Sequence, residues 1–135
     1  MDFFKVEKEN SHDLGFAHAC CLSGAITRDE FKSWVYWVIE HSNQELPGFF
    51  FDLIDLPDIS RSFYDAVGFV PSTGLNDEEA VALDGIAYMR GANDEVDYDV
   101  HIGREDALAT LRSNPQVIVR FRETFPFVGF PDSVL

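Results

Sequence analysis

The stretch that decides the fold class runs from Thr27 to His41 and reads TRDEFKSWVYWVIEH. Its first four residues form a capping box, with Thr27 as the N-cap and Glu30 at the third helical position. Five apolar residues then recur at the spacing of one buried helix face: Phe31, Trp34, Val35, Val38 and Ile39. The stretch therefore predicts one long amphipathic helix whose apolar face meets a core.

Similar signals predict helices on both sides of this stretch. Asp58, Asn76 and Asn114 stand where N-caps are expected, and Gly68 and Gly91 stand where left-handed C-terminal stops are expected. The predicted helices occupy residues 11–21, 58–67, 76–90, 104–112 and 115–125. The run FFFDLIDL at residues 49–56 fits either a short helix or a buried strand, because eight residues are too few for periodicity to decide.

The sequence thus predicts a mainly α protein, a compact single-domain bundle of five or six helices over residues 1–135. Apolar and polar residues alternate from Val96 to Ile102, which leaves room for a short extended segment or hairpin near residues 95–103. Small residues at positions 80, 82, 85 and 87 should let a neighbouring helix approach closely. Asp84 among them is either a rim residue or a buried acid that needs a partner.

The charge of the chain restricts its partners. Ten basic and 24 acidic side chains give a net charge of −14 at pH 7. Such a field repels nucleic acid and anionic membranes, attracts cationic surfaces, and favours a monomer before binding. The N-terminus lacks the apolar stretch of a signal peptide, and no apolar run is long enough to span a membrane. The adjacent Cys20 and Cys21 suit a reducing compartment, so we expect a cytoplasmic protein.

The sequence offers weak signals for chemistry. The acidic run DEVDYD at residues 94–99 has oxygen ligands for calcium, but an EF-hand loop counted from Asp97 would place Ile102 and Leu108 at its glycine and glutamate positions. His18 and Cys21 share a helix face, yet no glycine-rich oxyanion turn flanks them, and buried helix thiols are commoner than catalytic ones. We therefore expect no metal, no cofactor and no catalytic residue.

The candidate partner-binding residues are acids and aromatics. The run DEVDYD would form a docking surface for a cationic partner, with two acids of the helix at 76–90 nearby and an exposed Trp as an anchor. Trp37 is either a residue of a wide core or an exposed ring, and Tyr98 is open between the same two readings. The full set is Asp94, Glu95, Asp97, Tyr98, Asp99, Asp77, Glu78 and Trp37.

Three runs carry a resemblance to a known group of proteins: AITRDEFKSWVYWVIEHSNQELPGFFFDLIDL, FYDAVGFVP and ALDGIAYMRG. Their pattern of Phe, Trp, Pro-aromatic and Gly-Ile-Ala positions, within about residues 11–91, resembles small bacterial immunity proteins of contact-dependent growth inhibition and related polymorphic toxin systems. The resemblance implies a cytoplasmic protein that binds one cognate toxin domain, often a nuclease with a basic cleft, and neutralises it. It implies no catalytic residue, and the acidic run lies outside the similar part.

Two other functions stay open at this stage. A small metal-dependent hydrolase would use Asp84 or the clustered carboxylates of residues 94–99. A cytoplasmic adaptor for a basic partner unrelated to toxins would use the same acidic surface. A metal titration by calorimetry separates the hydrolase from the two binding proteins, and an upstream toxin reading frame separates the immunity protein from the adaptor.

Overall fold

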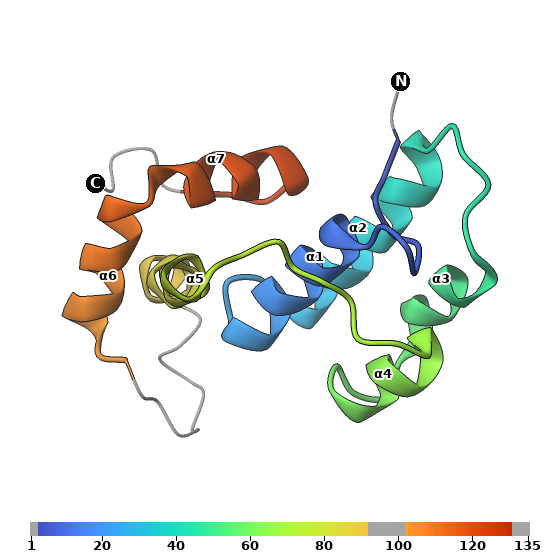
Figure 1. Cartoon of the computed structure of the whole chain (residues 1–135), viewed down its shortest axis with the longest axis horizontal. Coiled ribbons are helices and arrows are strands. Elements are labelled where there is room, and N and C mark those ends of the chain that lie inside the picture. Colours follow the sequence, from blue (N-terminus) through green and yellow to red (C-terminus); the bar gives the residue numbers. More distant parts are fainter. Residues whose placement is uncertain (1–2, 92–101, 131–135) are drawn as a thin grey trace. The chain divides into compact units, whose positions relative to one another are not determined.

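The computed structural model describes residues 3–91 and 102–130 of the chain. Backbone contacts divide the chain into two compact units, residues 1–22 with 28–74 and residues 23–27 with 75–135. Within the described residues both units are built from helices, which confirms the mainly α class (Figure 1). The sequence predicts that the whole chain forms a single domain. That expectation stays a prediction.

The described residues form seven α-helices and one 3₁₀ turn, where five or six helices were expected. The first unit holds α1 (His12–Ser23), α2 (Arg28–His41), α3 (Gly48–Asp52), the 3₁₀ turn η1 (Leu53–Asp55) and α4 (Arg61–Val67). The second unit holds α5 (Asp77–Arg90), α6 (Arg104–Ser113) and α7 (Pro115–Thr124). The run FFFDLIDL is thus helical, because α3 and η1 occupy nearly all of it. The hairpin expected near residues 95–103 lies outside the described residues except for Ile102 and Gly103.

Helix α2 is the core helix of the first unit. It begins at Arg28, as predicted, and Trp34 packs its ring edge-on against Phe50 of α3, with 5.7 Å between the ring centroids. Ile39 is only half-buried, so the buried stripe is narrower than predicted. Four of the five stripe residues are at most 2% exposed: Phe31, Trp34, Val35 and Val38.

The loop after α4 lies along α1 in the first unit. The backbone N–H of Ser72 donates a 2.9 Å hydrogen bond to the hydroxyl of Ser11, just before α1. Gly15, one turn further along α1, has no room for a side chain, because a Cβ there would overlap the carbonyl of Ser72. Glycine is therefore required at position 15 by the close approach of the loop rather than by its backbone angles.

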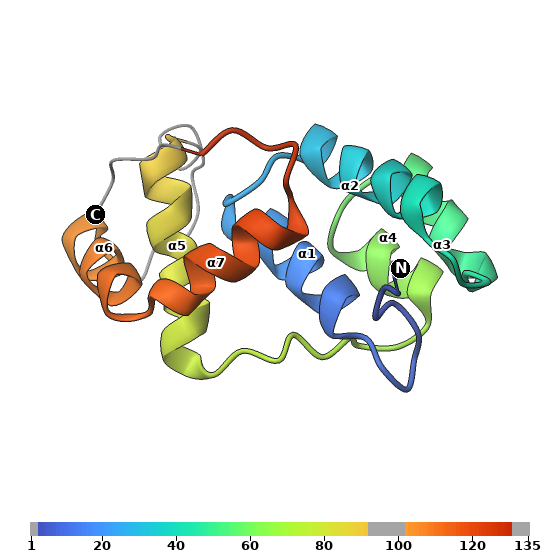
Figure 2. The same cartoon turned by 90° about the horizontal axis from the view of Figure 1, so that it is seen from above.

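Helices α5 and α6 pack closely against each other in the second unit, as Figures 1 and 2 show. Asn76 and Glu79 form the predicted capping box, and Gly91 ends α5 with a φ of 77°. A Cβ placed on Gly85 would lie 2.6 Å from the carbonyl oxygen of Ala107 in α6. The prediction that small residues on α5 admit a neighbouring helix is therefore confirmed at Gly85.

Two predicted N-caps behave differently from expectation. Helix α4 begins at Arg61 rather than next to Asp58, because the Asp58 carboxylate accepts hydrogen bonds at 3.0 Å from the N–H groups of both Ser60 and Ser62 and closes a turn before the helix. Asn114 does precede α7, yet its side chain makes no cap hydrogen bond. Its amide instead donates to the carbonyl of Thr110, 2.9 Å away, at the end of α6.

Candidate partner-binding surface

Five of the eight predicted binding residues lie outside the described residues: Asp94, Glu95, Asp97, Tyr98 and Asp99. They follow α5, whose last residue is Arg90, and precede α6, whose first residue is Arg104. The docking role of the acidic run DEVDYD therefore stays a prediction. The other three residues are described, and they belong to different units.

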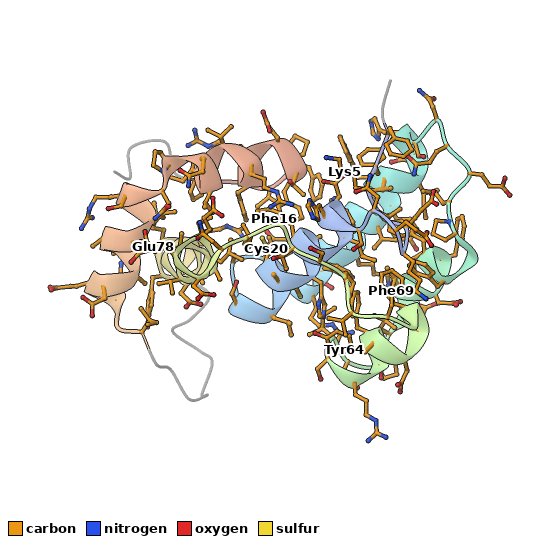
Figure 3. All side chains as sticks on the ribbon, viewed as in Figure 1. Lys5, Phe16, Cys20, Tyr64, Phe69 and Glu78 are labelled. Atoms are coloured by element: carbon orange, nitrogen blue, oxygen red, sulfur yellow. The ribbon has the colours of Figure 1, made fainter. Side chains whose placement is uncertain are left out.

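Asp77 and Glu78 stand in the first turn of α5, where their negative charge suits the helix dipole. Both side chains are exposed. Glu78 lies on the side of α5 that faces α6 (Figure 3), and its carboxylate accepts a 3.1 Å hydrogen bond from the amide of Asn114. Glu78 thus has a structural task between α5 and the junction of α6 with α7, whereas Asp77 is the more available carboxylate.

Trp37 lies in the first unit and is half-buried. The ring of Phe4 meets it edge-on with 5.6 Å between centroids, and the imidazole of His41 stacks on it at 4.3 Å. Phe4 is held there by Gln44, whose side-chain oxygen accepts from the Phe4 N–H at 2.6 Å and whose amide donates to the Phe4 carbonyl at 2.8 Å. The placement of Trp37 agrees better with a wide core than with an exposed anchor.

The residues considered for chemistry are engaged in packing. His18 is buried, stacks on Phe63 with 3.6 Å between ring centroids, and donates a 2.6 Å hydrogen bond through Nε2 to the carbonyl of Ile59. Burial lowers the pKa of His18 and raises the pKa of the Cys21 thiol to about 11. A thiol with that pKa is protonated at neutral pH, which argues against a Cys–His nucleophile.

One carboxylate proposed for a hydrolase, Asp84, lies within the described residues, whereas those of residues 94–99 lie outside them. Asp84 is half-buried on α5, in agreement with a position at the rim of the helix contact. Across residues 3–91 and 102–130, no three His, Cys, Asp or Glu side chains gather closely enough to hold a metal ion. None of the helices in these ranges combines the length and apolar character that crossing a membrane requires.

Sequence reasoning missed an acidic and aromatic segment in the first unit. Residues 48–67, which form α3, η1 and α4, carry one basic residue, Arg61, and the acids Asp52, Asp55, Asp58 and Asp65. Within and just after this segment, three apolar side chains are unusually exposed: Phe51 at 49%, Tyr64 at 37% and Val70 at 79%. The excess of acids was readable from the sequence, whereas the exposure of these rings depends on which faces of short helices pack inward. Helices α3 and α4 are neighbours (Figure 2).

A pocket of about 450 Å³ adjoins this acidic segment, between the first turns of α2 and η1. The Arg28 guanidinium lies at its wall and donates hydrogen bonds to the carbonyls of Leu56, at 2.6 Å, and Pro57, at 3.2 Å. The remaining lining residues are Asp29, Phe31, Lys32, Leu53, Ile54, Asp55, Leu56 and Ile59. Sequence spacing gave no warning of this pocket, because its two walls are more than 20 residues apart in the chain.

Searches of the chain against protein-family models, curated proteins and solved structures gave no match. The residues of this chain are therefore the only basis for a proposed function. The first unit combines an excess of carboxylates, exposed aromatic rings and a pocket lined in part by charged residues.

Proposed function

We propose that this chain is a cytoplasmic immunity protein that binds a basic toxin domain, of the nuclease class, and neutralises it without catalysing a reaction. The observation that carries the proposal is the combination of a net charge of −14 with exposed aromatic side chains beside carboxylates on α3, η1 and α4. The carboxylates attract a cationic surface, and the rings supply the desolvated contacts that hold it.

The charge suits this class of partner for a physical reason. A nuclease binds phosphate backbones, so its cleft is lined by Lys and Arg. A strongly acidic protein approaches such a cleft faster than a neutral one, because complementary fields raise association rates by about 10- to 1000-fold. The same field opposes binding of this chain to nucleic acid or to an anionic membrane.

The proposed partner is a protein, and no metal or cofactor enters the proposal. The position of His18 supports binding rather than chemistry, because its Nε2 is committed to the carbonyl of Ile59. The raised pKa of Cys21 points the same way. A protective role needs only a rigid surface that reaches the toxin quickly and leaves it slowly.

The test is neutralisation rather than binding alone. A tagged chain is expressed in its native host, the bound polypeptide is identified, and that polypeptide is produced with and without the chain in a sensitive host. We expect cell survival only on co-expression, inhibition of the purified toxin at an equimolar ratio, and an association rate that falls steeply with salt. A bound polypeptide that is harmless to cells, or a toxin unaffected by an excess of the chain, would refute the proposal.

Two matched variants separate the candidate docking surfaces. Asp94→Asn/Asp97→Asn/Asp99→Asn tests the acidic run, and Asp52→Asn/Asp55→Asn/Asp65→Asn tests the acidic segment of the first unit. Both remove three negative charges, and the second leaves Asp58 with its hydrogen bonds to Ser60 and Ser62. The variant that slows association and weakens protection more identifies the docking surface, and no effect from either would remove the electrostatic basis of the proposal.

A further inference from the structure

We propose that the pocket between α2 and η1 receives one long cationic side chain, an arginine or a lysine, of the basic partner. This inference rests on the proposed function and deepens it, because it names the chemistry of one anchor point. The pocket is lined entirely by residues of the first unit, so it lies within one compact part of the chain.

The size and walls of the pocket suit the stem of such a side chain. Its volume of about 450 Å³ falls in the range of ligand pockets, which runs from about 300 to 1,000 Å³. Apolar side chains line it from η1 and from the loop that follows, namely Leu53, Ile54 and Ile59. Arginine and lysine carry three or four methylene groups that pack on apolar walls while the charged head stays near water.

The rim of the pocket suits the charged head. Asp29 comes from the first turn of α2 and Asp55 from η1, so the two walls each contribute one carboxylate. Both side chains are exposed, and among the described residues neither has a hydrogen-bond or ion-pair partner. Each of these carboxylates is available to a cation without first losing an existing partner.

Two basic side chains, Arg28 and Lys32, also line the pocket, and within the described part of the chain only the Arg28 side chain forms hydrogen bonds to other residues. Two N–H groups of Arg28 donate to the carbonyls of Leu56 and Pro57, so Arg28 joins α2 to the loop after η1 and thereby shapes the pocket. Arg28 is a positioning residue in this arrangement. Lys32 is exposed and has no partner among the described residues, so its ammonium competes for the same carboxylates and must swing aside.

Other occupants fit these residues less well. An apolar side chain would pack against the apolar walls, but it would displace water from Asp29 and Asp55. The two carboxylates would then lose hydrogen bonds that the apolar group cannot replace. An anionic group would find a partner in the Lys32 ammonium, but it would also meet Asp29, Asp55 and the field of a chain with a net charge of −14. A cationic head is therefore the group that Asp29 and Asp55 favour, once the Lys32 side chain has swung aside.

The test uses a small probe, so it does not depend on knowing the partner. The full chain, labelled with ¹⁵N, is titrated by NMR with N-acetyl-arginine methylamide, and separately with the norleucine and glutamate analogues. We expect the arginine probe to move amide signals of residues 28–32 and 53–59, with much weaker responses to the other two probes. Thermal unfolding and the unperturbed part of each spectrum show that every variant is folded.

Charge-matched variants show whether the rim carboxylates are responsible. Asp29→Asn/Asp55→Asn should weaken the arginine probe about fivefold, which corresponds to about 1 kcal/mol of binding free energy. Asp52→Asn/Asp65→Asn removes the same charge from α3 and α4 outside the pocket and should change the affinity by less than about twofold. Lys32→Gln should strengthen binding, because it removes the competing ammonium.

Several results would overturn the inference. They are the absence of shifts at the pocket, equal responses to the norleucine or glutamate probe, and equal losses in the two double variants. A toxin that is bound equally well by Asp29→Asn/Asp55→Asn would show that its anchor lies elsewhere, while the proposed function would stand. Arginine binding at the pocket in a chain that protects against no toxin would instead refute the proposed function.

Discussion

Replacement of Gly85 by alanine gives the sharpest test of the packing in the second unit. The added Cβ would lie 2.6 Å from the carbonyl oxygen of Ala107 and 2.9 Å from the Cβ of Leu111. Ordinary contact begins near 3.4 Å, so the two helices must separate by about 0.8 Å, the difference between 3.4 and 2.6 Å. The neighbouring atom belongs to a backbone, which cannot rotate out of the way.

The magnitude follows from two opposing effects. Overpacking of this kind costs about 3 kcal/mol, the upper part of the usual range, because the whole of α6 must shift and its other contacts with α5 loosen. Alanine regains about 1 kcal/mol over glycine through helix propensity. We therefore expect Gly85→Ala to lower the free energy of unfolding by about 2 kcal/mol and the melting temperature by about 6–10 °C.

The assay is urea unfolding followed by circular dichroism, with Gly48→Ala as the matched control. Gly48 is the first residue of α3, its φ is not positive, and a Cβ there would meet nothing within 4 Å. The control should be as stable as the parent chain or more stable by about 0.5 kcal/mol. If Gly85→Ala matched its control in stability, α5 and α6 would not be in the contact described here.

Further predictions concern the core and the response to acid. Trp34→Ala should lower the free energy of unfolding by about 3–5 kcal/mol, measured by urea unfolding, and unchanged stability would contradict the burial of α2. Burial lowers the pKa of His18, so below pH of about 6.5 the unfolded chain binds a proton that the folded chain resists, and stability should fall from pH 7 to pH 5. His18→Gln keeps a donor for the carbonyl of Ile59 and should reduce that slope; an unchanged slope would assign it to other groups. Hydrogen bonds from Ser62 lower the pKa of Asp58, so its contribution is present above pH of about 4 and is lost as the pH falls through its folded pKa. Asp58→Asn should therefore flatten the stability curve below pH 4, and a curve as steep as that of the parent chain would show that Asp58 is not responsible.

Much of the secondary structure was predictable, because helix ends are set by local chemistry. Asn76 with Glu79 began α5 and Gly91 ended it as predicted, since a cap satisfies N–H groups within four residues of itself. Asp58 does not directly precede α4, and Asn114 precedes α7 as predicted but without a side-chain cap hydrogen bond, and both outcomes have the same cause. The side chains of Asp58 and Asn114 can each form a hydrogen bond with more than one nearby backbone group. The local sequence does not determine which of these hydrogen bonds forms.

The candidate site was less predictable than the helices. The acidic run at residues 94–99 was visible in the sequence, and its role stays a prediction. The pocket was invisible, because it needs Asp29 and Asp55 on different elements and Arg28 turned toward the carbonyls of Leu56 and Pro57. The contact of Trp37 with Phe4, which lies far away in the sequence, could not be predicted, and a role of Trp37 in binding stays a prediction.

The sequence alone determined that this chain is helical, strongly acidic and equipped with well-defined helix ends, because each of these properties depends on residues close together in the chain or on a simple count. Tertiary structure decided which of the described carboxylates accept hydrogen bonds from other residues, which have no such partner, and which line a pocket. Those outcomes depend on side chains that are distant in sequence, and only packing brings such groups together. Glu78 and Asp55 illustrate the difference, since both are exposed acids by sequence, yet one pairs with Asn114 and the other stands at the rim of the pocket.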